Sequence, residues 1–119
     1  MRVIAHNMLK CNVKGVSRGF PLKIVAEAVE EVDSDQPFDA ATTKMVLGRL
    51  DKEGLVSAAQ DLRVEDLDFE SEDEAMLERV HHFLFDLSVT DGKLVCPESG
   101  REFMIKDGIP NMLLHEDEV

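Results

Sequence analysis

The sequence of 119 residues contains no Trp, no Tyr and only two cysteines, Cys11 and Cys96. Six Phe are present, but without Trp or Tyr the chain lacks the aromatic platforms on which single-stranded bases stack. Two cysteines are too few for the disulfide framework of a small secreted protein. Basic residues are scarce, 13 against 25 acidic ones. The net charge of -12 therefore disfavours nucleic-acid binding by the protein as a whole.

Long hydrophobic runs are also missing. No apolar stretch approaches the roughly 20 residues of a membrane span. The apolar start of the chain is too short for a signal peptide and is interrupted by His6 and Asn7. We therefore expect a soluble intracellular protein with reduced thiols. Its length fits one domain, and its apolar fraction of 44% is ordinary for a globular protein.

The charges are unevenly distributed along the chain. Residues 61–78 carry nine acidic side chains against Arg63 alone. Residues 1–24 carry five basic side chains and no acidic one, namely Arg2, Lys10, Lys14, Arg18 and Lys23. This basic segment has two interpretations: it neutralises the acidic half of the same domain, or it meets an anion.

Both ends of the chain have strand patterns. Residues 2–5 are apolar and β-branched, and an alternation over residues 22–28 follows Pro21. Near the other end, residues 87–89 and 93–95 read as a hairpin joined by Asp91-Gly92, because Asp-Gly tolerates the positive φ of a tight turn. Residues 102–105 predict a further strand that ends at Asp107-Gly108.

The middle of the chain is predicted to be helical. Asp39 is a good cap for a helix that reaches Leu50, and residues 55–62 have one apolar helical face. Ser71 and Glu74 have the spacing of a capping box, which predicts a helix over residues 72–85. Because sequence-distant strands usually pair in one sheet, we predict an α+β fold. Residues 1–36 and 87–119 are expected to form one small β unit, with residues 37–86 as a helical insertion.

Residues 96–100, with the sequence Cys-Pro-Glu-Ser-Gly, have the shape of a zinc knuckle. Ser99 stands where the second thiolate of such a knuckle belongs. A structural zinc takes four ligands, mostly Cys and His. None of the four histidines (His6, His81, His82 and His115) has a paired ligand spacing with a cysteine. We therefore expect no zinc, and a turn held by packing and hydrogen bonds.

No catalytic set can be assembled from these residues. His81 and His82 lie next to each other on a predicted helix, so their rings point about 100° apart and cannot act as one unit. A thiol enzyme that uses Cys96 as its nucleophile remains an alternative, although nothing in the sequence places a base beside this thiol. Retained activity after Cys96→Ser would eliminate it.

Residues 108–114 form an apolar stretch that is followed by a charged tail. Pro110 cannot take part in a central ladder of hydrogen bonds, so the segment is predicted to lie at the edge of a sheet. An open apolar edge invites a strand from another chain. From the residues alone, a partner-binding strand and a plain core strand both remain open.

Two motifs carry a resemblance to a known family. The first comprises His6-Asn7-Met8-Leu9, residues 11–15 and residues 20–22, and the second comprises residues 94–103 and 108–114. Together they resemble the terminal motifs of the eukaryotic tRNA-methyltransferase activator subunits, also called multifunctional methyltransferase subunits. The middle of the chain, residues 32–74, is far less specific.

The resemblance implies a zinc-ribbon-like β unit built from both termini. It also implies a non-catalytic subunit that forms 1:1 heterodimers with several S-adenosylmethionine-dependent methyltransferases, which act on tRNA, rRNA and a translation release factor. The enzyme would hold that cofactor, and this chain none. The chain would contact tRNA or rRNA only as part of the complex. The complex would work in the cytoplasm and nucleus and would not bind membranes. By position, a strand zipper would use His6, Asn7, Met8, Leu9, Ile109, Pro110, Asn111, Met112 and Leu113.

The chain departs from the family in its cysteines. Metal-binding members are expected to have four, but here Val16 and Ser99 occupy two of the positions beside Cys11 and Cys96. Our hypothesis is that packing of Val16 against the sheet replaces the cross-link made by the metal. A stand-alone degenerate zinc-ribbon protein that binds RNA through the basic segment is the alternative function.

Overall fold

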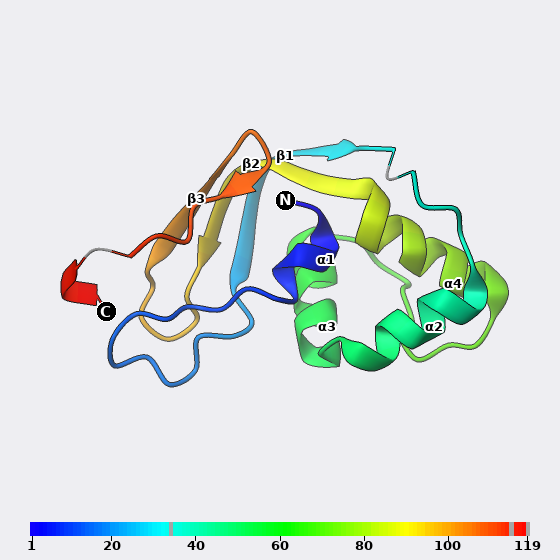
Figure 1. The fold of residues 1–119 in the computed structure, drawn as a ribbon, viewed down its shortest axis with the longest axis horizontal. Helices are drawn as coiled ribbons and strands as arrows, with labels where there is room; N and C mark the ends of the chain where they lie inside the picture. Colours follow the sequence, from blue (N-terminus) through cyan, green and yellow to red (C-terminus); the bar gives the residue numbers. More distant parts are fainter. Residues whose placement is uncertain (34, 115, 119) are drawn as a thin grey trace.

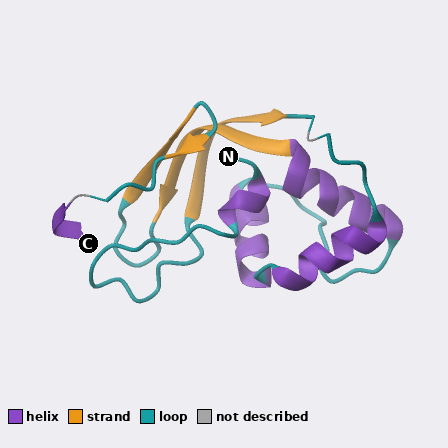
Figure 2. Cartoon of the chain, in the orientation of Figure 1, coloured by secondary structure: helices purple, strands orange, loops and turns teal. Residues whose placement is uncertain are grey.

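The computed structural model describes residues 1–33, 35–114 and 116–118. An antiparallel four-stranded sheet lies to one side of a group of helices (Figures 1 and 2). Across the sheet the strands follow the order β1 (Lys23–Glu31), β2 (Leu87–Val95), β3 (Glu102–Lys106) and β4 (Ile109–Pro110). The helices are α1 (Val3–His6), α2 (Ala40–Arg49), α3 (Lys52–Asp61) and α4 (Glu74–His81), with a π-helical turn η1 (His82–Asp86) and a 3-10 turn η2 (Glu116–Glu118). The predicted α+β class is confirmed.

The sheet joins the two ends of the chain. β1, near the N-terminus, pairs with β2, so that Ile24 lies opposite Leu94. Leu94 also lies opposite Phe103 of β3. These side chains are buried in one core with apolar residues of the helices, which include Leu55, Leu77, Val80 and Leu84. The prediction that strands from distant segments share one sheet is therefore confirmed.

The predicted hairpin at Asp91-Gly92 is wrong, because β2 continues straight through these residues. The register of β1 against β2 shifts around Ala28, where β1 bulges. A Cβ on Gly92 would lie 2.2 Å from the carbonyl oxygen of Val25. The glycine is thus required by the close approach of the neighbouring strand and not by a turn.

The predicted strand over residues 2–5 is also wrong. Val3–His6 forms the single helical turn α1, and only Arg2 makes an isolated bridge, to Ser88 of β2. Val3 and His6 are both buried, and a spacing of three residues places them on the same side of a helical turn. So short an apolar run does not distinguish a strand from a helix by its sequence pattern.

The helices in the middle of the chain are close to expectation. Asp39 accepts a hydrogen bond from the amide of Thr42 (3.2 Å) and caps α2 as predicted. The predicted capping box of α4 does not form, since the helix begins at Glu74 with Asp73 as its N-cap. The Ser71 hydroxyl instead accepts from the amide of Asp73 (3.1 Å), a local turn that competes with a helical start. No helix of the described residues is long and apolar enough to cross a membrane.

Truncation of the central strand should be costly. Leu94 is fully buried between β1 and β3, so Leu94→Ala should lower the free energy of unfolding by about 2–5 kcal/mol in urea denaturation. Val25→Ala, at a position on β1 that is 37% exposed, is the matched control and should change it by less than about 1 kcal/mol. Equal losses in the two variants would contradict this placement of the core.

Candidate partner-binding surface

The last strand of the sheet has an open side. Asp107 and Gly108 adopt positive φ values of 51° and 78°, which turn the chain from β3 into β4. Beyond β4 the pairing continues, because the amide of Asn111 donates to the carbonyl of Met104 (2.9 Å). β4 lies at the edge of the sheet, on the side opposite β1. The edge position predicted for Pro110 is confirmed.

Three apolar side chains are exposed along this edge: Met104 (58%), Ile109 (69%) and Leu113 (80%). We call them the edge patch. Ile109 and Leu113 line one open hollow of about 560 Å³, and Met104 and Leu113 line another of about 390 Å³. Pro110 and Asn111 follow Ile109 in the sequence, and Met112, before Leu113, is partly buried against the core. Hydrophobic side chains that gather on a strand edge are typical of a protein-binding surface.

Sequence reasoning missed Met104. Along β3, Phe103 and Ile105 are buried and alternate with exposed Glu102, Met104 and Lys106. A methionine at a solvent-facing position of an alternating strand is unusual beside charged neighbours. This alternation was visible in the sequence and could have identified Met104.

The predicted N-terminal site residues take different roles in the structure. His6 is buried, and its Nε2–H donates to the carbonyl of Leu22 (2.6 Å), which sets the tautomer. Asn7 makes two hydrogen bonds of 2.9 Å with the backbone of Asp51, at the start of α3. Leu9 packs partly against the core, while Met8 is 72% exposed. Met8 is thus the side chain of this motif that is most open to a partner.

The two terminal motifs are connected through Met1. Val89 donates to the carbonyl of Met1 (2.7 Å), and the amino group of Met1 donates to the carbonyl of Val89 (2.7 Å). The same amino group also donates to the carbonyl of Gly108, in the turn before β4. The segment that carries α1 therefore begins beside the turn that leads into the edge patch.

The two cysteines are buried side by side but do not form a metal site. Burial raises the pKa of the Cys11 thiol. Burial alone would also raise the pKa of Cys96, but hydrogen bonds with the side chain and backbone of Ser99, the backbone of Glu98 and the Cys11 thiol together lower that pKa. Among the residues that the structure describes, no three His, Cys, Asp or Glu side chains are grouped to hold a metal ion. A structural zinc needs four such ligands, so the residues present do not fit one. His115, named as a possible ligand, lies outside the described residues.

A thiol enzyme is not supported by these surroundings. Cys96 is buried, and its sulfur accepts a hydrogen bond from the amide of Ser99 (3.3 Å). Its thiol also interacts with the Ser99 side chain, the Glu98 backbone and the Cys11 thiol, and none of these three groups is a base. A nucleophile needs access to a substrate and an adjacent base, and this thiol is shielded from solvent.

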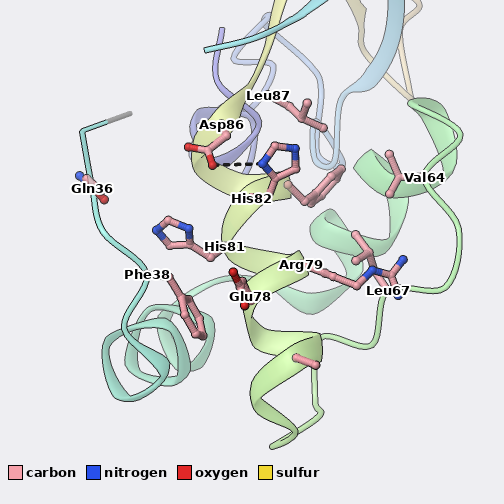
Figure 3. A pocket seen from close by; sticks show the side chains of 12 residues that line it. Gln36, Phe38, Val64, Leu67, Glu78, Arg79, His81, His82, Asp86 and Leu87 are labelled. Carbon is pink, nitrogen blue, oxygen red and sulfur yellow. Dashed lines mark hydrogen bonds and ion pairs between the residues drawn. The ribbon is translucent and has the colours of Figure 1, made fainter. Parts of the chain in front are cut away.

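A groove of about 710 Å³ runs along α4 and η1, on the helical side of the molecule (Figure 3). His81 and His82 both line it, but their rings point to different sides of the helix. The His81 ring contacts the rings of Phe38 and Phe85, while His82 bonds to Asp86 (3.1 Å) and Glu31 (3.3 Å). The expectation that these histidines do not form one unit is confirmed.

The basic residues of the N-terminal segment do not neutralise the acidic half by direct pairing. Lys93 pairs with Glu102, and Arg101 pairs with Glu118. Within residues 1–33, 35–114 and 116–118, no ion pair within 4.0 Å involves any of the five basic side chains of residues 1–24. These side chains are exposed.

The sequence profile of Trm112p-like proteins matches residues 4–108. The chain belongs to this family. It is 44% identical to the multifunctional methyltransferase subunit TRM112 homolog A of Arabidopsis thaliana, over the full length of both chains. It is 37% identical to the TRM112-like subunit of Mus musculus, with 99% of this chain and 98% of the relative covered.

A solved structure supports the same assignment. The chain resembles one from the E. cuniculi Mtq2–Trm112 complex, which is responsible for methylation of the translation termination factor eRF1. The TM-score is 0.62, the sequence identity is 26%, and 95% of each chain is covered. Members of the Trm112 family are non-catalytic methyltransferase subunits, and we assign this role to the chain. The resemblance inferred from the two terminal motifs is confirmed.

The buried His6 should make stability depend on pH. Burial lowers the pKa of His6 by more than the Leu22 carbonyl and Asp61 raise it. The unfolded chain therefore binds a proton near the ordinary value of 6.5, before the folded chain does. The contribution of the neutral ring is full above that pH and is lost as the pH falls towards the lowered value. His6→Gln should flatten this loss in urea midpoints measured from pH 7.5 to 5, whereas parallel curves for the two proteins would contradict it.

Proposed function

We propose that the chain binds methyltransferase catalytic subunits one to one through the edge patch, and stabilises and activates them. The observation that carries this proposal is the exposed apolar edge of the sheet, in a chain whose described residues show no base beside the buried thiol of Cys96. The Trm112 chain of E. cuniculi assembles with Mtq2, which supports the same type of partner here. The partners are expected to act on tRNA, rRNA and a translation release factor.

Strand addition to β4 is the proposed mode of contact. The amide of Asn111 points inward to Met104, so alternation turns the backbone of Pro110 and Met112 outward. Pro110 has no N–H to donate, which leaves its carbonyl and the Met112 backbone to pair with a partner strand. The same alternation turns the amide of Leu113 towards β3, but it donates to the Asn111 side chain (3.1 Å), so the pairing with β3 does not continue through this amide.

The edge patch would supply most of the binding free energy. Full burial of one large apolar side chain stabilises a complex by about 1.5–3 kcal/mol. Met8 would add a further apolar contact, since it is 72% exposed. His6 and Asn7 are proposed to act indirectly, because their hydrogen bonds hold the N-terminal motif in place. Covering the apolar surface of both partners explains how such a subunit keeps an enzyme soluble.

We propose that S-adenosylmethionine is bound by the enzyme and not by this chain. Residues 1–36 and 87–119 are proposed to act as a zinc-ribbon-like β unit that docks, with residues 37–86 as a helical insertion. We also propose that the complexes work in the cytoplasm and nucleus.

Affinity purification of the tagged chain from its own cells, with mass spectrometry of the recovered proteins, identifies the enzymes. Recovery of RNA without any methyltransferase would contradict the proposal.

Charged substitutions in the edge patch should abolish binding. Ile109→Asp and Leu113→Asp each place a carboxylate where an apolar contact forms, and burial of an unpaired charge costs several kcal/mol. The affinity for a co-purified methyltransferase, measured by titration calorimetry, should fall by about 100-fold or more. Both residues are exposed in the free chain, so circular dichroism should show an unchanged fold.

Val56→Asp provides the matched control for these variants. Val56 is 45% exposed, but it lies on α3 and away from β4. This variant should bind with the affinity of the unmodified chain. Retained binding by both edge variants, or an equal loss in the control, would contradict the proposed surface.

A further inference from the structure

Glu98 connects two loops that are far apart in the sequence. Its carboxylate accepts hydrogen bonds from the Ser17 amide (3.1 Å), the Ser17 hydroxyl (3.0 Å) and the Arg18 amide (3.2 Å). Glu98 belongs to the knuckle, residues 96–100, whereas Ser17 and Arg18 belong to the N-terminal loop, residues 11–19. A single side chain thus ties the knuckle to the N-terminal loop across 81 residues of sequence. These bonds, those of Ser17 first, hold the pKa of Glu98 below its usual value.

Each loop is closed by its own backbone. In the knuckle, the amide of Cys96 donates to the carbonyl of Arg101 (2.9 Å), and that of Gly100 donates to the carbonyl of Cys96 (3.1 Å). In the N-terminal loop, the amide of Cys11 donates to the carbonyl of Gly19 (2.9 Å). A Cβ on Gly19 would lie 2.3 Å from the Cys11 carbonyl oxygen, so this closure requires glycine. The two turns keep a thiol-presenting shape without a metal ion to impose it.

A second connection reinforces the first. Arg101, directly after the knuckle, forms a bidentate pair with Glu118 at 2.6 Å and 3.2 Å. The carbonyl of Glu118 accepts from the amide of Lys14 (2.6 Å), in the N-terminal loop. The C-terminal turn η2 therefore contacts the N-terminal loop and the residue that follows the knuckle. Fork-shaped pairs between Arg and a carboxylate are among the stronger hydrogen-bonded contacts in proteins.

Packing by Val16 does not provide this connection by itself. Val16 is half-buried and packs against the core, and the hypothesis that this packing replaces the cross-link made by the metal stays a prediction. Ser99 stands at the other position expected for a ligand, and its amide bonds to the Cys96 sulfur. Both positions are thus occupied by groups that serve a site without metal. Besides the contact of the Cys11 and Cys96 thiols, the two loops are joined by the hydrogen bonds that the Glu98 carboxylate accepts.

We propose that Glu98 has taken over the role of a metal ion, and cross-links the knuckle to the N-terminal loop so that the β unit folds and functions without zinc. A metal would bind the two loops through four thiolates. Here one ionised carboxylate binds three N–H and O–H groups of the opposite loop.

The first test measures the amide hydrogens that Glu98 holds. In Glu98→Ala, exchange of the Ser17 and Arg18 amides should become about five- to tenfold faster, the effect of losing one ordinary hydrogen bond. Glu98→Gln keeps one side-chain oxygen, so its Ser17 and Arg18 amides should exchange at rates between those of the unmodified chain and those of Glu98→Ala. The amide of Val89, which bonds to Met1, should exchange as before, because the loss is local. The melting temperature of Glu98→Ala should fall by about 2–4 °C.

Controls separate this link from a general effect of removing charge. Glu27→Ala removes an exposed carboxylate of β1 and should leave the Ser17 and Arg18 amides unchanged. Purified unmodified protein should contain no stoichiometric zinc by mass spectrometry, and EDTA should not alter its exchange or melting temperature. One zinc per chain, with exchange accelerated by EDTA, would overturn the proposal. Equal exchange in Glu98→Ala and Glu27→Ala would overturn it as well.

A rescue variant tests whether carboxylate and metal serve the same purpose. Val16→Cys with Ser99→Cys, introduced into Glu98→Ala, restores four thiols at the two loops. This triple variant should bind one zinc per chain and regain the slow exchange of Ser17 and Arg18, and EDTA should abolish both. Zinc binding without regained protection of these amides would show that the metal and Glu98 do not join the loops at the same place. It would overturn the proposal that Glu98 takes over the role of a metal.

Discussion

The antiparallel pairing of β1 with β2 determines how the rest of the molecule is arranged. It places Ile24 opposite Leu94 and thereby closes the chain between segments that are distant in sequence. The N-terminal loop precedes β1 and the knuckle follows β2, so the pairing of Lys23 with Val95 brings the two loops to the same end of the sheet. This pairing brings Glu98 within reach of Ser17.

The two edges of the sheet differ: one is covered by a helix, and the other is open to a partner. At the β1 edge, the Asp61 carboxylate at the end of α3 accepts from the amide of Ile24 (2.9 Å). A helix thus covers the beginning of that edge and satisfies a backbone group that would otherwise be open. At the other edge, β4 and the residues after it carry the exposed side chains of Ile109 and Leu113. A partner strand therefore has an apolar edge to meet at β4.

Local sequence patterns were reliable at one helix cap and one tight turn, although the capping box predicted at Ser71 does not form. Asp39 caps α2, and Asp107-Gly108 forms a turn, because a cap and a tight turn involve only a few neighbouring residues. Asp91-Gly92 has the same composition as that turn but lies inside β2. The difference lies in the long strand β1, whose backbone requires glycine at position 92 for close approach. No window around Asp91 contains that information.

The candidate site shows the same division. The sequence by itself determined the α+β class, the edge position of Pro110, the incomplete set of thiols and the two motifs of the methyltransferase-subunit family. These properties follow from residue identity and short spacings. The tertiary structure decided that His6 is buried while Met8 is exposed, that Met104 joins Ile109 and Leu113, and that Glu98 spans to Ser17. Each of these depends on segments that meet only after β1 and β2 have paired, and contacts at that sequence distance leave no local pattern.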